Sequence, residues 1–373
     1  MGILPGFVGP ASTLRSPNVN DEELINWMVS AAPSGTPKAP VWLCPTPGYH
    51  PFLALGQGPV RGVFEQDGVA FAVGGGNLYK VLSRQIARGI AISPAIRTDT
   101  RPTTFATFNK ATGHQLIFPS GNLLYLYDYV SDTLVNVPLD WPVTMVDFID
   151  GRFLGLEALT NKFHWSDLEN GLSWPSLNFA QLVQSSDNIV ALKAIHGQIW
   201  LWGTKTTVVW DDVGGLQVFA PIPGSLMQQG CAAAFSVQVI DNAPFWLGSN
   251  EFGAGKVYRG QGVGAVPIVV STSAVDYDIS KAHDLSGCVA FTYEQEEHAF
   301  YVLYIPGRPW HWAYDVTTRE WHKRARWDPV AMQWTPDLPW VHMYAFGKHL
   351  VGARNSDVLY EMSVNFGSNR VVV

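Results

Sequence analysis

Seven times along the chain, a hydrophobic segment runs into a polar turn, a second hydrophobic segment follows, and a third ends on an aromatic residue with a polar neighbour. The turns are Asp67-Gly68, Lys110 to Gly113, Asp150-Gly151, His196-Gly197, Asp241-Asn242, Glu294 to Glu297 and Phe346-Gly347-Lys348. The aromatic closers are Tyr79-Lys80, Tyr127-Asp128, Trp165-Ser166, Trp210-Asp211, Tyr258-Arg259, Tyr314-Asp315 and Tyr360-Glu361. Asp-Gly between apolar runs is a strong hairpin signal, so each phrase predicts a small antiparallel sheet.

The phrases recur with a period of roughly 40–50 residues, which is typical of β-propeller blades. A pair of β-sandwiches would lack this long repeat, and a β-helix would have a shorter one. Neighbouring blades bury each other's faces when they pack radially. The sequence therefore predicts an all-β fold, a β-propeller of six or seven blades with an extended N-terminal arm. Closing the ring is expected to need strands from both ends of the chain, because an open ring leaves sheet edges bare.

Three regions are expected along the chain: an arm over 1–57, a propeller over 58–365 and a C-terminal tail over 366–373. The arm is rich in Pro, Ser and Asn, and it contains one helical candidate, Asp21 to Val29, with Asn20 as its cap. The run from Pro37 to Pro51 should be extended. Such an arm is expected to lie along its own propeller or along a neighbouring subunit.

Composition limits the functions that this fold carries. The net charge of −7 argues against a generic nucleic-acid binder, although local basic groups can still border DNA. The cysteines Cys44, Cys231 and Cys288 are far apart and form no CxxC pair, which supports neither a disulfide framework nor a zinc site and favours a reducing compartment. No signal peptide or apolar membrane-spanning stretch is evident.

Candidate catalytic groups are weak. His298, His311 and His322 cluster in the sixth repeat, but their spacing matches no metal motif. The carboxylates that could form a glycosidase pair are Asp147, Asp150, Asp167 and Glu169. Three of these positions are turns, where Asp is favoured for local hydrogen bonding. We therefore predict no enzyme, no cofactor and no metal site.

One basic cluster follows Trp321, and it contains Lys323, Arg324 and Arg326. The simplest interpretation is a solvated loop between blades. Alternatively, the three cations contact DNA phosphates, or they pair with an acidic partner subunit.

The arm and the first repeats carry an ordered set of short motifs. They are Arg15-Ser16-Pro17-Asn18, Ile25-Asn26-Trp27, Pro45-Thr46-Pro47-Gly48, Val60-Arg61-Gly62 and Gly76-Asn77-Leu78-Tyr79. Further along come Phe148 to Phe153, Trp165 to Leu168, Ser186 to Leu192 and Ser225 to Cys231. In this order the chain resembles the packaged-DNA stabilisation proteins of short-tailed bacteriophages, which are also described as tail-hub or nozzle proteins.

The resemblance implies a structural role. Such proteins assemble as a ring, usually hexameric, below the portal and adaptor rings of the virion; they close the channel around packaged double-stranded DNA and carry fibres or spikes. By this resemblance the protein is placed in the phage tail after assembly in the host cytoplasm, with no membrane insertion. The arm residues that would contact a subunit or the adaptor are Arg15, Pro17, Asn18, Asn26 and Trp27. Longer members continue beyond the last repeat, which leaves the lower channel gate and needle contacts outside this prediction.

Two other classes stay open on sequence grounds. A carbohydrate-binding or glycan-hydrolysing propeller would use some of the 15 Trp as sugar-stacking surfaces. A cellular scaffold propeller is the third class, but the chain lacks the repeated Gly-His and Trp-Asp signature of its commonest family.

Overall fold

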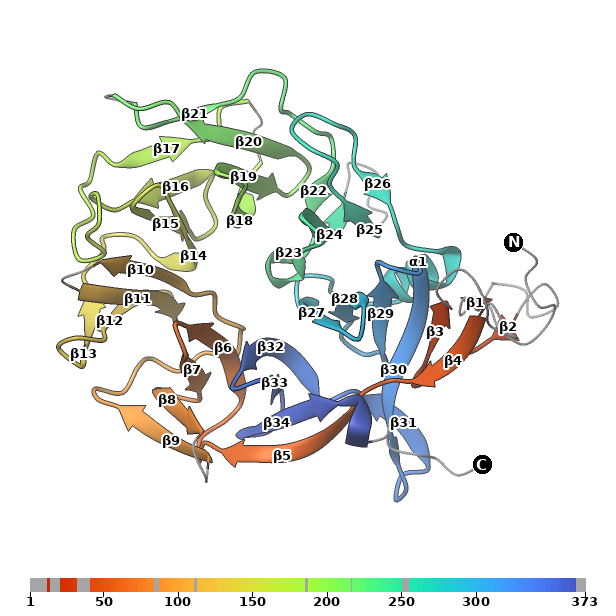
Figure 1. The fold of residues 1–373 in the computed structure, drawn as a ribbon. Helices are drawn as coiled ribbons and strands as arrows, with labels where there is room; N and C mark the ends of the chain where they lie inside the picture. Colours follow the sequence, from red (N-terminus) through yellow and green to blue (C-terminus); the bar gives the residue numbers. More distant parts are fainter. Residues whose placement is uncertain are drawn as a thin grey trace.

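The described residues form seven small antiparallel sheets around a common axis (Figure 1). The structure, a computed structural model, describes residues 12–13, 21–31, 41–83, 87–110, 113–184, 187–215, 217–249 and 255–366. Within each sheet consecutive strands pair, except that β22 pairs with β24 and that β34 pairs with β5 from the N-terminal arm. The predicted β-propeller is confirmed, and its blade count is seven.

The first four blades each contain four strands. Blade 1 comprises β6 (Val60–Gln66), β7 (Val69–Gly74), β8 (Asn77–Ser83) and β9 (Ala87–Ile92). Blade 2 comprises β10 (Ala106–Lys110), β11 (Gly113–Ser120), β12 (Leu123–Asp128) and β13 (Thr133–Val137). Blade 3 comprises β14 (Val143–Ile149), β15 (Arg152–Glu157), β16 (Lys162–Trp165) and β17 (Phe179–Gln181). Blade 4 comprises β18 (Ile189–Ile195), β19 (Gln198–Gly203), β20 (Thr207–Asp212) and β21 (Phe219–Pro221).

The last three blades depart from this plan. Blade 5 comprises β22 (Gly230–Cys231), β23 (Gln238–Ile240), β24 (Ala243–Ser249), β25 (Lys256–Arg259) and β26 (Ile268–Val269). Blade 6 has a fifth strand and comprises β27 (Val289–Gln295), β28 (His298–Tyr304), β29 (His311–Asp315), β30 (Glu320–Asp328) and β31 (Gln333–Pro336). Blade 7 comprises β32 (Pro339–Ala345), β33 (Lys348–Ala353), β34 (Val358–Ser363) and β5 (Gly48–Ala54). Between blades 5 and 6 lies helix α1 (Ser273–Ser280).

The repeated phrases of the sequence match the first three strands of each blade. Two consecutive residues have positive φ in the six such turns that the structure describes in full, as in the primed turns that suit hairpins; they are Asp67-Gly68, Asp150-Gly151, His196-Gly197, Asp241-Asn242, Glu296-Glu297 and Phe346-Gly347. Every aromatic closer lies in the strand after the hairpin, which is the third strand of its blade except in blade 5, where it is β25. These turns share one rim of the ring, here called the hairpin rim. The opposite rim, here called the connection rim, carries the turns between second and third strands and the links between blades.

The ring closes through the N-terminal arm. Strand β5 pairs antiparallel with β34, with Ala54 opposite Val358 and Gly48 opposite Ser363. The expectation that both ends of the chain share one blade is therefore confirmed. Strand β5 lies within the predicted arm, residues 1–57, yet it is the outer strand of blade 7. The propeller sheet therefore begins before the predicted boundary between arm and propeller.

The predicted helix from Asp21 to Val29 is wrong. Residues in that span form β2 (Asp21–Glu22), which pairs with β1 (Ser12–Thr13), and the start of β3 (Trp27–Ala31), which pairs with β4 (Val41–Pro45). Asn26 has φ +61°, a left-handed conformation that stops a helix. Tertiary contacts with blade 6 decide this segment, and they override its local helical preference. The predicted extended run up to Pro51 is confirmed over its described part by β4 and β5.

Aromatic residues fill the spaces between blades. Trp202 and Trp246 are fully buried at the contact of blades 4 and 5, with ring centroids 5.8 Å apart. Phe71 of blade 1 meets Tyr127 of blade 2 at 5.6 Å. Most of the aromatic-rich composition is therefore explained as blade packing. None of the described helices has the length and apolar character needed to cross a membrane.

Candidate functional site

The described part of the arm docks on the outer side of blade 6, and we call this contact the arm seam. Ile25 forms a parallel bridge with Lys323 of β30. The backbone N–H of Asn26 donates to the carbonyl of Lys323 at 2.8 Å, and the N–H of Lys323 donates to the carbonyl of Leu24 at 2.9 Å. The side chain of Asn26 donates to Ala325 O at 2.8 Å and accepts from Ala325 N at 3.0 Å. The arm thus satisfies backbone groups that an outer strand would leave bare.

Lys323 belongs to this seam and is not on the surface. Only 1% of its area is exposed, and its Nζ lies 2.6 Å from Oε1 of Glu23 in the arm. The same ammonium lies 3.9 Å from the ring centroid of Trp310. A buried ammonium is tolerated when a carboxylate and an aromatic face replace its water. The interpretation of this basic run as a solvated loop is wrong, because Lys323 lies in the middle of strand β30.

Arg324 is buried on the other side of β30, facing blade 7. Its guanidinium carbon lies 5.2 Å from the ring centroid of Tyr293 and 4.9 Å from that of Phe300. Its Nε donates to Nε2 of His322 at 3.1 Å. Burial, together with the charge of Arg324, lowers the pKa of His322 well below its usual value. Arg326 is the exposed member of the three, and its contact with DNA or a partner stays a prediction. A direct contact of Lys323 would require the seam to open, whereas Arg324 is buried on the opposite face of the strand.

A serine, a histidine and an aspartate line up where the arm hairpin meets blade 6. Ser30 Oγ and His298 Nε2 are 3.2 Å apart, and His298 Nδ1 lies 2.6 Å from Asp315 Oδ2. The hydrogen bond with Asp315 raises the pKa of His298 despite the opposing effect of burial. The order of atoms is that of a serine hydrolase triad. However, Ser30 is only 8% exposed and lies on a regular strand opposite Trp42. The arrangement serves as a polar latch between arm and blade.

The described arm residues that the sequence singled out have different environments. Asn26 is engaged within its own chain, as described above. Trp27 is 46% exposed, and its contact with another subunit or an adaptor stays a prediction. The other three, Arg15, Pro17 and Asn18, lie outside the described residues.

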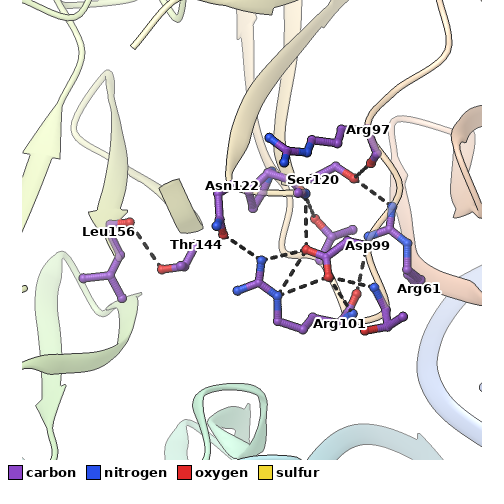
Figure 2. Close-up of polar contacts among 12 residues, drawn as sticks. Arg61, Arg97, Asp99, Arg101, Ser120, Asn122, Thr144 and Leu156 are labelled. Carbon is purple, nitrogen blue, oxygen red and sulfur yellow. Dashed lines mark hydrogen bonds and ion pairs between the residues drawn. The ribbon is translucent and has the colours of Figure 1, made fainter. Parts of the chain in front are cut away.

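The Val60-Arg61-Gly62 motif holds blades 1 and 2 together. Arg61 is fully buried, and its guanidinium donates to Gly75 O at 3.2 Å and to Ser120 Oγ at 2.8 Å (Figure 2). Burial lowers the pKa of Arg61. A side chain at Gly62 would place its Cβ 2.4 Å from Thr103 Cγ2, so the close contact of blades requires glycine there.

An ion pair extends this junction on the connection rim. Asp99 and Arg101 lie 2.7 Å apart, and Arg101 also donates to Asn122 Oδ1 at 2.7 Å (Figure 2). Burial alone would raise the pKa of Asp99, but its hydrogen bonds with Arg101 outweigh burial and lower that pKa to about 2. Sequence reasoning missed this network, because its members are spread over two blades. Only Arg61 lies in a motif that the sequence singled out.

The carboxylates considered for a glycosidase support turns and blade contacts. Asp150 takes a positive φ in its hairpin turn, and Asp147 accepts from Ala194 N at 2.9 Å across to blade 4. Asp167 accepts a hydrogen bond from Ser173. No group of three or more potential metal-ligating side chains is found within the described ranges.

The protein is a seven-bladed β-propeller. One strand of the N-terminal arm closes the ring of blades, and polar groups of the same arm fix it to blade 6. The chain belongs to the family described as bacteriophage P22 Gp10, β-propeller, whose family model matches residues 16–366. This match confirms the resemblance to phage stabilisation proteins and supports a structural role in a phage. No curated protein matches this sequence.

Several solved structures share the fold at low identity. The extracellular domain of the putative one component system BT4673 from B. thetaiotaomicron is 10% identical, with a TM-score of 0.53; the match covers 85% of this chain and 40% of that one. YCF48 from Cyanidioschyzon merolae is 10% identical, with a TM-score of 0.52 and coverages of 86% and 99%. The Cps50 (Swd1) β-propeller domain of Myceliophteria thermophila is 8% identical, with a TM-score of 0.53 and coverages of 84% and 99%. These likenesses concern the propeller architecture alone.

Proposed function

We propose that the protein is a component of a phage tail that forms an oligomeric ring, with six copies, below the portal and adaptor. As a tail hub or nozzle, this ring closes the DNA channel and stabilises the packaged genome until ejection. The observation that carries the proposal is the family match over residues 16–366, nearly the whole chain.

The fold suits a rigid block in such a ring. In a closed propeller every blade packs against a neighbouring blade on each side. The loops and outer strands remain available as several independent contact surfaces. The exposed indole of Trp27, on the arm hairpin, is the kind of side chain that anchors protein interfaces. Its place on the arm supports contact with a neighbouring subunit or with the adaptor.

The charge of the chain fits a channel component. A net charge of −7 disfavours tight adhesion of DNA, so the duplex can slide past while a narrow ring prevents leakage. Fibre or spike proteins would occupy surfaces left free by the arm and the channel. Assembly in the host cytoplasm and incorporation into the virion follow from this role.

Reconstitution with the portal–adaptor complex of the same phage tests the proposal. Electron microscopy should show one ring of this protein at the adaptor end, and its mass should give the copy number. The W27S variant should fold as the wild type does and bind the adaptor more weakly. A propeller that stays monomeric and does not bind the portal–adaptor complex would contradict the proposal.

A further inference from the structure

A cavity of about 380 Å³ opens between blades 6 and 7 on the connection rim, and we call it the blade 6/7 cavity. Strands β28 to β31 supply one wall, and β32, β34 and the turn between β33 and β34 supply the other. Its volume falls within the range of small-ligand pockets. The lining residues used below are Tyr304, His311, Arg326, Thr335, Asp337 and Arg354.

Two exposed arginines give this cavity a positive character. Arg326 comes from blade 6 and Arg354 from blade 7. The Arg354 guanidinium carbon lies 4.6 Å from the ring centroid of Tyr304, which fixes its position against the wall. Neither arginine forms an ion pair with a described residue. Two arginines that line one small space without an ion-pair partner favour an anionic ligand.

The one carboxyl group in the wall is already engaged. Asp337 accepts from Tyr49 OH at 2.5 Å and from the backbone N–H of Leu338 at 2.9 Å. Burial raises the pKa of Asp337. The charge of Arg326 acts on the pKa of Asp337 in the opposite direction, but Asp337 forms no ion pair with Arg326 or Arg354, so both arginines can still bind a ligand.

A buried histidine adds an unused hydrogen-bonding atom. His311 is 2% exposed, lines the cavity, and its Nδ1 has no hydrogen-bond partner among the described residues. Burial and the charges of Arg324 and Arg354 lower the pKa of His311 to about 3, so the ring is neutral. A buried polar atom without a partner is uncommon in proteins and needs an explanation. Because Nδ1 is itself shielded from solvent, a ligand in the cavity meets the two arginines first, and the neutral ring of His311 adds no positive charge to the wall.

The surroundings favour a protein carboxylate over a phosphate. Guanidinium groups bind carboxylates and phosphates alike, but the wall also offers aromatic rings and prolines, which suit the apolar parts of a peptide. A cavity of this size is too small for duplex DNA, whose major groove alone is about 12 Å wide.

An exposed apolar hairpin tip lies beside the cavity. Arg326 and Thr335 are paired across β30 and β31, and the same hairpin continues to a turn in which Val330 is 92% exposed and Met332 is 69% exposed. Trp327 and Trp334 brace the hairpin, with ring centroids 5.3 Å apart. An apolar tip next to a cationic cavity matches a peptide that carries apolar and acidic side chains together.

We propose that the blade 6/7 cavity is a docking site for an acidic segment of a partner protein, with an Asp or Glu carboxylate held between Arg326 and Arg354. Apolar side chains flanking that carboxylate contact the tip formed by Val330 and Met332. The inference goes beyond the proposed ring, because it does not depend on the number of subunits or on the arm.

Charge reversal on a matched pair of sites tests the proposal. The double variant R326E/R354E changes the cavity, and R97E/K205E makes the same change of charge at two exposed residues elsewhere on the connection rim. The milder R326Q/R354Q variant covers the case in which charge reversal disturbs folding, which circular dichroism checks. The probe is a fluorescent peptide of alternating Glu and Leu, and its anisotropy is measured at low ionic strength. A Gln/Leu peptide, inorganic phosphate and a short DNA duplex serve as comparison ligands.

The Glu/Leu peptide should bind the wild type and R97E/K205E alike. Its affinity for R326E/R354E should fall at least about tenfold, or about 1.4 kcal/mol, and the Gln/Leu peptide should bind weakly. If R326E/R354E and R97E/K205E lost peptide affinity equally, the loss would come from the overall charge of the protein, and the proposal would be overturned. Phosphate or duplex DNA competing as well as the acidic peptide would overturn it in favour of a phosphate ligand. Undetectable binding of the Glu/Leu peptide would also overturn it.

Discussion

The side chain of Asn26 hydrogen-bonds both backbone groups of Ala325, which lies 299 residues further along the chain. Nδ2 donates to the carbonyl at 2.8 Å, and Oδ1 accepts from the N–H at 3.0 Å. One amide group therefore mimics the pairing of an additional strand at the outer side of blade 6. The motif residue Asn26 thus has a defined role within a single subunit.

Replacing Asn26 by alanine should loosen the arm. The N26A variant loses two hydrogen bonds and retains an unfavourable positive φ, so the free energy of unfolding should fall by about 2–3 kcal/mol. N26G removes the same bonds without the conformational penalty and should be less destabilised by about 1 kcal/mol. Urea denaturation measures both, and limited proteolysis should show earlier cleavage in the arm of N26A. Equal stability of N26A and wild type would show that this contact contributes nothing.

Strand β5 should be indispensable to the propeller. Deletion of residues 1–54 removes the outer strand of blade 7 and leaves the edge of β34 unpaired. We expect the truncated protein to lose its cooperative thermal transition and to aggregate, because a bare edge pairs with other chains. Deletion of residues 1–20 is the matched control, since it removes only β1 among the described strands and should leave the transition intact. Size-exclusion chromatography and calorimetry distinguish these outcomes.

Acidification should destabilise the junction of blades 6 and 7. Burial lowers the pKa values of His311 and His342 to about 3, and it lowers that of His322 well below the usual 6.5. The unfolded chain therefore binds protons at these positions at a higher pH than the folded chain. The stability that the neutral rings contribute is present above about pH 6.5 and is lost progressively as the pH falls towards about 3.

The size of this effect can be measured by urea denaturation at a series of pH values. Each histidine contributes a slope of up to about 1.4 kcal/mol per pH unit, so replacing His342 with Gln should reduce the slope by about that amount. His298 acts in the opposite sense, because its pKa is raised; its contribution is present below about pH 6.5 and is lost as the pH rises through its folded-state value. A stability that does not change between about pH 7 and about pH 4 would contradict this account.

The hairpin turn at Phe346-Gly347 should allow a stabilising substitution. Phe346 has φ +58°, and Asn-Gly is preferred to Phe-Gly in a turn of this kind. The F346N variant should therefore gain about 0.5–1 kcal/mol and melt at a higher temperature. D67N is the control, because Asp67 already tolerates the left-handed conformation and should show little change. A lower melting temperature of F346N would indicate that the half-exposed ring of Phe346 contributes more than the turn costs.

The sequence predicts the hairpins well because their signals are local. Asp67 and Gly68 specify their turn within two residues, and the aromatic closers follow at a fixed distance. The arm was predicted wrongly because its conformation depends on a distant partner, namely Ala325 for Asn26 and Lys323 for Ile25. No window of neighbouring residues contains that information.

The basic run in β30 was misjudged for a related physical reason. Consecutive cations usually indicate solvent exposure, but the strand sends Lys323 towards Trp310 and Arg324 towards Phe300 on its opposite faces. Both cations are buried because aromatic rings, and for Lys323 also Glu23, take the place of water. His322, Lys323 and Arg324 are three consecutive polar residues, so no alternation of apolar and polar positions indicates a strand there.

The pairing of β5 with β34 also sets the order in which the molecule can be completed. During synthesis, β5 emerges early, and its partner emerges only after the strands of six further blades. An interrupted chain therefore remains an open arc with β5 unpaired, however well its other blades have formed. Closure of the last blade thus reports that translation has passed β34, so only chains that include this strand offer a closed propeller for assembly.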